Sequence, residues 1–408
     1  MSDRESGGAD AEPTPAVVVR EARPADADAV AAFTRDTWGE RHDDYIPRVF
    51  PEWAASDDPD RETFVATLPS EAVTDSDAVT ERDDREPGDT LVEGDGAGAA
   101  APGDQEAVVG CIQGVLLSEW ESWGQGIRVD PAARGFGVGT ALSEAALEWA
   151  RGRGATVCRN MVFSWNVMGL GQSRAVGFEP GTEFRFAEPA PDAGAVPDAG
   201  EADATDSADA AGDTASDGFQ AVDDPDPNAA WAFWTDSDAR DHLRGLALDP
   251  GESWACSALT RDRLRTAADE GRLLAVAEAP ATPGAGRGPI AGFAVRTRTS
   301  ERPAADGGDD DCDSASDGDA DTERVAEYGV SAWRDVDAAG ALYQSIAADA
   351  AEAGADATRV LIPETVEHVS DTGANRVPVA AEPDFVMSAD LTGSGSGPGA
   401  TDVTTDDL

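Results

Sequence analysis

The alternation of apolar and polar residues divides the chain into two patterned blocks, at about 16–188 and 229–392. In the first block, short β-branched or alternating runs predict strands, and apolar residues at three- and four-residue spacing predict helices. The predicted strands are 16–20, 64–68, 108–117, 120–130, 156–163 and 183–187. The predicted helices are 23–38 and 139–153, and a short helix or turn is predicted at 166–176. This interleaving predicts a mixed α/β fold.

The remaining stretches are rich in Asp, Gly, Ala, Pro and Ser and poor in large apolar residues. Such segments cannot bury enough surface to offset the entropy lost on ordering. We therefore expect disordered tails at 1–15 and 393–408, an acidic linker at 189–228, and acidic loop insertions at 69–105 and 301–323.

The second block repeats the first at a constant offset of about 200 residues. An amphipathic helix followed by Gly-Ala and a strand occurs in both blocks. The matching pairs are Leu142 and Leu342, Ala150 and Ala350, Gly154 and Gly354, Ala155 and Ala355, and Arg159 and Arg359. The repeat predicts two domains of related fold, at 16–188 and 229–392.

The charge balance narrows the classes of function. The chain has 81 acidic and 30 basic residues, for a formal net charge of −51, and every basic residue is Arg. The absence of Lys excludes a P-loop lysine, a Schiff-base lysine and a kinase-type ATP site. Binding to nucleic acid or to an anionic membrane is not expected, because phosphate recognition needs clustered cations.

The environment is also predicted from composition. Aspartates outnumber glutamates and Lys is absent, which favours a halophile's protein, because salt screens self-repulsion. The four cysteines lack CxxC spacing and there are only 3 His, so neither a zinc site nor a disulfide framework is expected. The polar N-terminus and the lack of a long apolar run predict a cytoplasmic protein without a signal peptide or membrane span.

One motif carries chemistry, the stretch IRVDPAARGFGVGTAL at 127–142. A strand ends at Val129, a turn passes Pro131, and a loop with Gly135, Gly137 and Gly139 opens an amphipathic helix. Glycines let several backbone N–H groups converge, and the helix N-terminus adds its positive dipole end. The motif therefore predicts a phosphate or pyrophosphate site, to which Arg134 adds a charge-assisted contact.

Three interpretations of this loop compete. A Rossmann dinucleotide fingerprint would need a third glycine at position 140, which is Thr140, and an acidic residue ending the next strand, which is missing. A plain glycine turn before a helix is the second interpretation. The third is a resemblance: Arg134, Gly137 and Gly139 match motif A, [Arg/Gln]-x-x-Gly-x-[Gly/Ala], of the GCN5-related N-acetyltransferase (GNAT) family.

The order of the predicted elements resembles the same family, and so does Asn166 followed by Gly177-Phe178. The resemblance covers roughly 16–188. It implies two GNAT-like domains, each a mostly antiparallel twisted sheet flanked by helices, and acetyl transfer from acetyl-CoA to a primary amine without a metal. The cofactor-binding residues that it implies are Ile127, Arg128, Val129, Arg134, Gly135, Phe136, Gly137, Val138, Gly139, Thr140 and Asn166.

The resemblance also implies catalytic candidates. Attack by an amine needs a base, and Glu121, then Glu119, is expected on the strand before motif A, where alternation puts both on one face. Many family members place a Tyr seven residues after the Asn as general acid; here that position is Ser173. Tyr45 borders the expected acceptor site and is a further candidate, although an exposed or packed Tyr would look the same.

The second block lacks the glycine loop, because Gly135, Gly137 and Gly139 correspond to Asp335, Asp337 and Ala339. Two carboxylates would repel a pyrophosphate. The sequence therefore predicts an N-terminal acetyltransferase and a degenerate C-terminal domain. The alternatives are a weak or inactive acyl-CoA-binding regulatory module, which Ser173 favours, and a scaffold built from two folds.

Overall fold

A computed structural model describes residues 15–35, 37–39, 44–74, 106–195, 218–280, 288–303 and 322–393. Most of the predicted tails, linker and insertions lies outside these residues. The chain forms two compact units. The first unit comprises Met1–Asn160, Gly171–Glu179 and Ser388–Leu408, and the second comprises Met161–Leu170 and Pro180–Met387.

The first unit contains a sheet that runs β1, β2, β3, β4, β5, antiparallel except for the parallel pair β4–β5. The strands are β1 (Val18–Glu21), β2 (Arg61–Pro69), β3 (Glu106–Leu116), β4 (Glu121–Val129) and β5 (Val157–Phe163), whose last residues lie in the second unit. The helices are η1 (Pro24–Asp26), α1 (Ala27–Thr34), α2 (Ile46–Ala55), α3 (Ser70–Thr74), η3 (Pro131–Ala133), α4 (Val138–Gly152) and most of α5 (Val167–Ala175).

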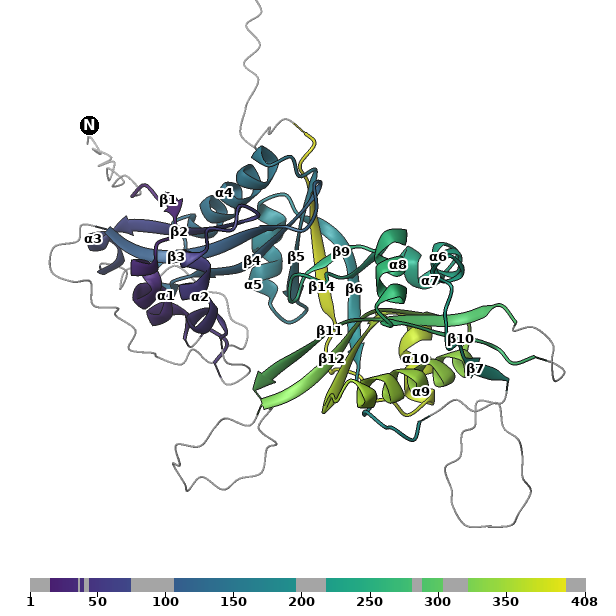
Figure 1. Ribbon diagram of the computed structural model, residues 1–408. Helices are drawn as coiled ribbons and strands as arrows, with labels where there is room; N and C mark the ends of the chain where they lie inside the picture. Colours follow the sequence, from purple (N-terminus) through teal and green to yellow (C-terminus); the bar gives the residue numbers. More distant parts are fainter. Residues whose placement is uncertain are drawn as a thin grey trace, which may run out of the picture. The chain divides into compact units, whose positions relative to one another are not determined.

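Helices cover both faces of this sheet (Figure 1). On one face α4 buries Val138, Leu142 and Ala146 against β2 and β3. On the other face α1 and α2 bury residues such as Val30 and Phe50. Sequence reasoning predicted one helix over 23–38, but α1 ends at Thr34, and the helix Ile46–Ala55 had no predicted counterpart.

The second unit repeats this plan. Its sheet runs β7, β10, β11, β12, β13, β6, again antiparallel except for one parallel pair, β12–β13. The strands are β6 (Glu179–Ala187), β7 (Phe219–Ala221), β10 (Leu273–Glu278), β11 (Ile290–Pro303), β12 (Thr322–Trp333), β13 (Ala357–Pro363), the start of β14 (Asp384–Asp390), and a hairpin of β8 (Leu246–Leu248) and β9 (Cys256–Ala258). The helices are α6 (Pro227–Thr235), α7 (Asp238–His242), α8 (Arg261–Asp269), α9 (Val336–Glu352) and α10 (Val366–Ala374).

The helix-to-strand connection is built alike in both units. Gly154 (φ +95°) and Gly354 (φ +68°) end α4 and α9 in the left-handed region, which glycine adopts without strain. The N–H of Ala155 donates to the Ala150 carbonyl at 3.1 Å, and the N–H of Ala355 donates to the Ala350 carbonyl at 3.0 Å. The mixed, mostly antiparallel α/β architecture predicted from the sequence is confirmed.

The unit boundaries differ from the sequence blocks at the last strand of each block. Strand β6, which ends the first block, pairs antiparallel with β13 inside the second unit. Residues 388–391, which end the second block, belong to the first unit, where the N–H of Leu391 donates to the Thr156 carbonyl at 2.9 Å. Each unit is therefore completed by a strand from the other half of the sequence.

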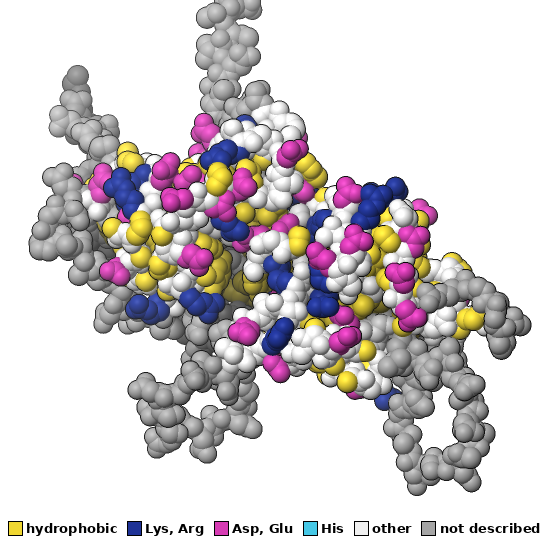
Figure 2. Space-filling view, viewed as in Figure 1, with side chains coloured by type: hydrophobic (Ala, Val, Ile, Leu, Met, Phe, Trp, Pro, Cys, Tyr) yellow, Lys and Arg dark blue, Asp and Glu magenta, His cyan; other side chains and the backbone are white. Residues whose placement is uncertain are grey.

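The surface carries acidic and arginine side chains interspersed, as one face of the molecule shows (Figure 2). Among the described residues no helix is both long and apolar enough to cross a membrane. The three described cysteines, Cys111, Cys158 and Cys256, are buried and form no disulfide with one another. Burial raises the pKa of Cys111 to about 12 and that of Cys158 to about 11, so neither is a ready nucleophile at neutral pH.

Candidate functional site

The glycine loop leads from β4 into α4. Asp130 directly follows the last residue of β4. Its carboxylate accepts a hydrogen bond from the Ala132 N–H at 2.9 Å, which fixes the turn at η3. Gly135 (φ +84°) and Gly137 (φ +80°) take left-handed conformations, and no atom lies within 4 Å of the place where a Cβ would stand on either. The loop is therefore an open stretch of backbone, in which non-glycine residues would be strained.

The N-terminus of α4 is electrostatically bare. Gly137 is its N-cap, no side chain caps the helix, and the first turn holds no acidic residue. The first N–H groups of a helix need partners and carry the positive end of the dipole. Arg134 is exposed, and its guanidinium makes no hydrogen bond or ion pair with the residues that the structure describes. The arrangement suits an anion such as a pyrophosphate.

Strands β4 and β5 separate beside this loop. They pair in parallel only where Glu121–Trp123 meets Val157–Arg159. Beyond that point the edge of β4 that faced β5, over Gly124–Val129, pairs with no other described strand of the first unit. An unpaired edge can hold an extended ligand through main-chain hydrogen bonds. One acceptor on this stretch is already used, because the Ile127 carbonyl accepts from Arg128 Nη1 at 2.9 Å.

The side chain of Arg128 serves the fold rather than this opening. Its guanidinium donates to Asp44 through Nε at 2.6 Å and Nη2 at 3.1 Å, and the Asp44 side chain is fully buried. The same group lies 4.6 Å from the centre of the Trp38 ring and 5.7 Å from that of Tyr45. Because the Arg128 side chain is bound to Asp44, only its backbone groups are available for the predicted contacts with the cofactor.

The other apolar members of the motif also pack inward. Val138 is buried, and Ile127, Val129 and Phe136 pack against the core under α4. Thr140 lies in the first turn of α4 and is partly exposed. Their side chains position the loop, so recognition at this site rests on backbone groups.

Three polar side chains gather behind the loop, and two of them had not been predicted. Asn160, the first β5 residue after the paired stretch, donates from Nδ2 to Ser173 Oγ at 3.0 Å. Gln172 packs its amide on Gly139, whose Cβ would stand 3.1 Å from Gln172 Cδ. Asn160 Oδ1 and Gln172 Nε2 are buried and have no hydrogen-bond partner among the described residues. Such orphaned groups in a native fold call for a ligand or water.

Glu121 occupies a different position from the one expected of a base. Its side chain is 3% exposed, and its carboxylate accepts from Arg159 Nη1 at 2.6 Å. A carboxylate in a buried ion pair would have to give up that pair to accept a proton. The structure thus commits Glu121 to holding β4 and β5 together at the closed end of their separation.

The prediction that Glu119 lies on the same strand face as Glu121 is wrong. Strand β4 begins at Glu121, and Glu119 is exposed in the tight turn after β3. The Ser118 hydroxyl accepts from the backbone N–H of Glu121 at 3.1 Å, which holds the turn closed. Alternation does not apply across a turn, so the two carboxylates share no face.

The two remaining candidates, Tyr45 and Asn166, have other roles in the fold. Tyr45 is the 38% exposed N-cap of α2, and its ring meets Trp53 edge-on at 6.2 Å. Asn166 falls in Met161–Leu170 of the second unit, where its Oδ1 accepts from the Gly169 N–H at 2.9 Å and caps α5.

Comparison with known proteins agrees with the motif. Residues 53–167 match the family model described as the acetyltransferase (GNAT) family. No curated protein matches the sequence. This segment of the chain is therefore similar to the GNAT family, and the match spans β2 to β5 with the glycine loop between them.

Comparison with solved structures finds several matches, all with low sequence identity. A GCN5-related N-acetyltransferase from Sphaerobacter thermophilus is 15% identical, with a TM-score of 0.49, over 92% of this chain and 96% of that one. A tandem GNAT protein from the clavulanic acid biosynthesis pathway is 14% identical, with a TM-score of 0.42, over 93% and 100%. A GCN5-related N-acetyltransferase from Kribbella flavida is 14% identical, with a TM-score of 0.36, over 92% and 71%.

Proposed function

We propose that the first unit is an N-acetyltransferase that uses acetyl-CoA to acetylate a primary amine. The observation that carries the proposal is the uncapped α4 N-terminus behind left-handed Gly135 and Gly137, set beside the unpaired edge of β4. A bare helix end suits a pyrophosphate, and a free strand edge suits the extended amide-bearing arm that follows it in CoA.

The residues present fit such a ligand. Backbone N–H groups from Gly135 to Thr140 would hold the pyrophosphate, with Arg134 adding charge. The β4 edge would pair with the arm. Asn160 Oδ1 and Gln172 Nε2, buried without partners among the described residues, would supply an acceptor and a donor for its amides.

The bound thioester supplies the acetyl group, and its departing thiolate needs stabilisation. Ser173 Oγ is buried and accepts a hydrogen bond from Asn160 Nδ2, so its own proton is available for donation toward the opening. We assign Ser173 the role that a tyrosine holds elsewhere in the family, with Asn160 as its positioning residue. A serine donates a hydrogen bond but is a much weaker acid than a tyrosine.

Among the described residues, neither of the two carboxylate candidates is placed to receive the proton of the amine. Glu121 is ion-paired with Arg159, and Glu119 lies in the turn beyond the closed end of the strand pair. We therefore propose that the amine enters as its free base. The value of kcat/KM should then rise with pH in step with the acceptor's own ionisation, and shift between amines of different pKa.

The test is calorimetric titration of acetyl-CoA into the whole protein in molar KCl, followed by thiol release with a panel of amines. One site per chain with thiol release supports the proposal. Binding without release for any amine would favour a regulatory acyl-CoA-binding module, and no binding would reduce the loop to a turn. A protein that folds fully in salt-free buffer would overturn the halophile interpretation.

Replacing Ser173 by Ala tests the donor. We expect kcat to fall about tenfold, below the usual span for a strong general acid, while KM for acetyl-CoA stays unchanged. Asn160→Asp should also lower kcat, because a carboxylate cannot donate a hydrogen bond to Ser173 Oγ. An unchanged kcat in both variants would remove this pair from the chemistry.

We propose that the second unit does not bind acetyl-CoA. The Asp335 carboxylate accepts from the Ala338 N–H at 2.9 Å and so occupies the start of α9. Arg334 donates to Glu278 at 2.6 Å and to Asp335 at 3.0 Å. No bare anion site remains there.

A further inference from the structure

The second unit holds a cavity of about 520 Å³ where β12 ends and where α7 and α10 begin. By the 200-residue offset, Trp333 and Arg334 at the end of β12 correspond to the residues that precede the glycine loop in the first unit. The volume of the cavity is that of an ordinary small-molecule site. The lining residues are Ala229, Ala232, Phe233, Asp236, Ser237, Asp238, Ala239, Pro289, Ile290, Trp333, Arg334, Glu367 and His368.

The apolar part of the lining is aromatic. Trp333 is 7% exposed, and its Nε1 donates to Asp371 at 3.0 Å, which fixes the ring. Its ring centre lies 4.9 Å from that of His368. Phe233 and Ile290 line other parts of the cavity. Fixed aromatic rings attract a cation that carries an apolar body.

The charges on the lining are mostly negative and uncommitted. Asp236, Asp238 and Glu367 make no ion pair with any residue that the structure describes, and all three are exposed. The single cation, Arg334, is already bound by Glu278 and Asp335. An anion such as a CoA pyrophosphate is repelled here, whereas an ammonium group meets three carboxylates.

His368 adds a directed polar group. It is 4% exposed, and burial lowers its pKa to about 4, so the ring is neutral at pH 7. The Thr365 hydroxyl accepts the His368 backbone N–H at 3.1 Å and lies 2.8 Å from Nδ1. Donation of the hydroxyl proton to Nδ1 assigns the ring proton to Nε2. Nε2 has no hydrogen-bond partner among the described residues.

We propose that this cavity binds a small organic ammonium ion with an apolar body. The carboxylates of Asp236, Asp238 and Glu367 would face the charge of the ligand. The Trp333 and Phe233 rings would contact its apolar body. The Nε2–H of His368 would donate to a hydrogen-bond acceptor on the ligand. The second unit would thus bind a cation, whereas the first unit is proposed to bind an anion. The inference stands whether or not the first unit transfers acetyl groups.

The probes are benzylammonium, benzyl alcohol and benzoate, which share a ring and differ in charge. Each is titrated calorimetrically into the full chain in 2 M KCl. The salt suppresses diffuse cation accumulation around a −51 protein. We expect benzylammonium to bind near one per chain, the alcohol about tenfold more weakly, and benzoate least. Equal binding of amine and alcohol, or no binding of the amine, would overturn the proposal.

Two variants localise the site. Asp238→Asn with Glu367→Gln should weaken benzylammonium about tenfold, the scale of two partly screened charge contacts. The matched control is Asp269→Asn with Glu352→Gln, which removes the same charge from exposed positions outside the cavity. Equal weakening in the control would show a diffuse charge effect and overturn the site.

The second variant is Ala232→Trp, which places a bulky ring in the cavity from an exposed position on α6 and changes no charge. It should abolish benzylammonium binding while the thermal midpoint of the protein stays unchanged. Retained binding in this variant would place the ligand elsewhere and overturn the proposal.

Discussion

Helices α4 and α9 occupy corresponding places in the two units, but their N-termini differ in capping and charge. In the first unit the helix begins behind Gly137 with no side-chain cap. In the second unit Asp335 caps the helix, and a second carboxylate, Asp337, stands in the first turn. A bare helix end binds an anion but contributes less to stability, whereas a capped end stabilises the helix and excludes an anion.

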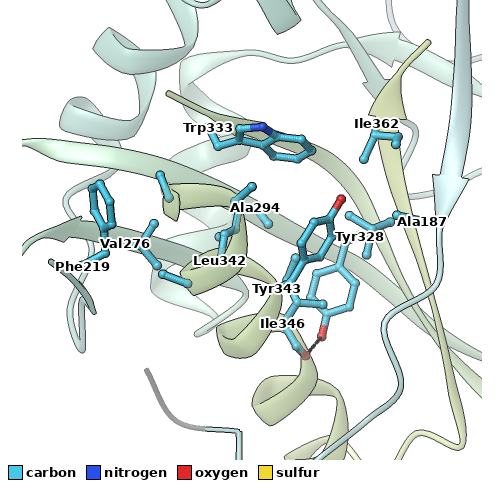
Figure 3. Packing of buried hydrophobic residues seen from close by; sticks show 14 of the residues in the cluster. Ala187, Phe219, Val276, Ala294, Tyr328, Trp333, Leu342, Tyr343, Ile346 and Ile362 are labelled. Atoms are coloured by element: carbon cyan, nitrogen blue, oxygen red, sulfur yellow. Dashed lines mark hydrogen bonds between the residues drawn. The ribbon is translucent and has the colours of Figure 1, made fainter. Parts of the chain in front are cut away.

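The strand pairs that flank these helices differ in the same sense. Strands β4 and β5 separate after Trp123 and leave an edge unpaired. Strands β12 and β13 pair from Val325 to Tyr328, and beyond that pairing the Ser331 hydroxyl donates to the Leu361 carbonyl at 2.8 Å. Large side chains fill the second unit under α9, where Trp333, Tyr343 and Ile362 belong to one buried cluster (Figure 3).

The cluster is also tied by hydrogen bonds. Tyr328 Oη donates to the Ile346 carbonyl at 3.2 Å, the contact drawn in Figure 3, and lies 2.6 Å from Asp349 Oδ2. Tyr343 Oη lies 2.7 Å from Thr372 Oγ1. In the unit without a glycine loop, the corresponding helix, α9, therefore contributes to the packed core.

The substitution with the largest expected effect is Gly137→Asp, which gives the first unit a carboxylate at the start of α4. We expect acetyl-CoA affinity to fall about 100-fold or more, because a carboxylate would face the pyrophosphate at a φ of +80°. Titration calorimetry measures the loss. Gly152→Asp, at the far end of the same helix with no neighbour within 4 Å, is the control and should bind normally. Gly137→Asn separates backbone strain from charge.

The next test uses glutamate–arginine ion pairs, which lie between the parallel strands of both units. Glu121 binds Arg159 at 2.6 Å in the first unit, and Glu327 binds Arg359 at 3.3 Å and Arg298 at 2.6 Å in the second. Because the unit without a glycine loop also has such an ion pair between its parallel strands, we assign both pairs to strand pairing. Glu121→Gln and Glu327→Gln should each lower the free energy of unfolding by about 3 kcal/mol.

Denaturant titration measures that loss, and Glu119→Gln, in the exposed turn, should stay within about 0.5 kcal/mol of the parent. The pH profile of kcat/KM should be unchanged in Glu121→Gln at temperatures where the variant is folded. A stable variant with lost turnover and a shifted profile would instead restore Glu121 as the base.

A third test contrasts two buried carboxyls by pH. Burial raises the pKa of Asp384, in the second unit, to about 6, against a partial lowering by Arg359. Burial would also raise the pKa of Asp26, in the first unit, but the Arg20 guanidinium and the Arg23 N–H outweigh it and hold the pKa below its usual value. The two carboxyls therefore respond to acid with opposite sign.

Between pH 3.8 and 6 the unfolded chain ionises Asp384 before the folded chain does, so stability from this group falls as pH rises through that window. Asp384→Asn should raise the free energy of unfolding by about 2 kcal/mol at pH 7.5 and leave it unchanged at pH 3.5. The contribution of Asp26 is present above its unfolded pKa and is lost below it. Denaturant titration at the two pH values checks both signs.

The smallest expected effect concerns the cap itself. Asp335→Ala should lower the free energy of unfolding by about 1 kcal/mol, the usual worth of an N-cap. Asp337→Ala, in the same turn, is the control and should cost less. Neither variant should bind a second acetyl-CoA per chain, because Trp333 and Tyr343 still pack in the buried core of the second unit. A second acetyl-CoA per chain in Asp335→Ala would contradict the comparison.

Local chemistry made part of this protein predictable. The glycine loop, the α4 helix and the repeat of helix, Gly-Ala and strand depend on residues within about twenty positions of one another, where φ preference and helical spacing act directly. The bounds of α4 and β5 follow the prediction closely. The helix at Ile46–Ala55 was missed because Pro47 and Pro51 interrupt its apolar pattern.

The roles of charged side chains could not be predicted in the same way. Arg128 and Asp44 are 84 positions apart, and Glu121 and Arg159 are 38 apart. Spacing on one strand says nothing about a partner that another element brings near. The candidates Arg128 and Glu121 were therefore chosen by position, and the fold gave both of them ion pairs.

The sequence by itself determined the two related α/β blocks, the glycine loop at 134–140 and its replacement by carboxylates 200 residues later. These are local properties of backbone conformation and charge. Only the tertiary structure decided which strands complete each unit, which carboxylates are paired, and where the orphaned amides of Asn160 and Gln172 lie. The physical reason is that burial and partner choice are properties of packed neighbours, which chain order does not specify.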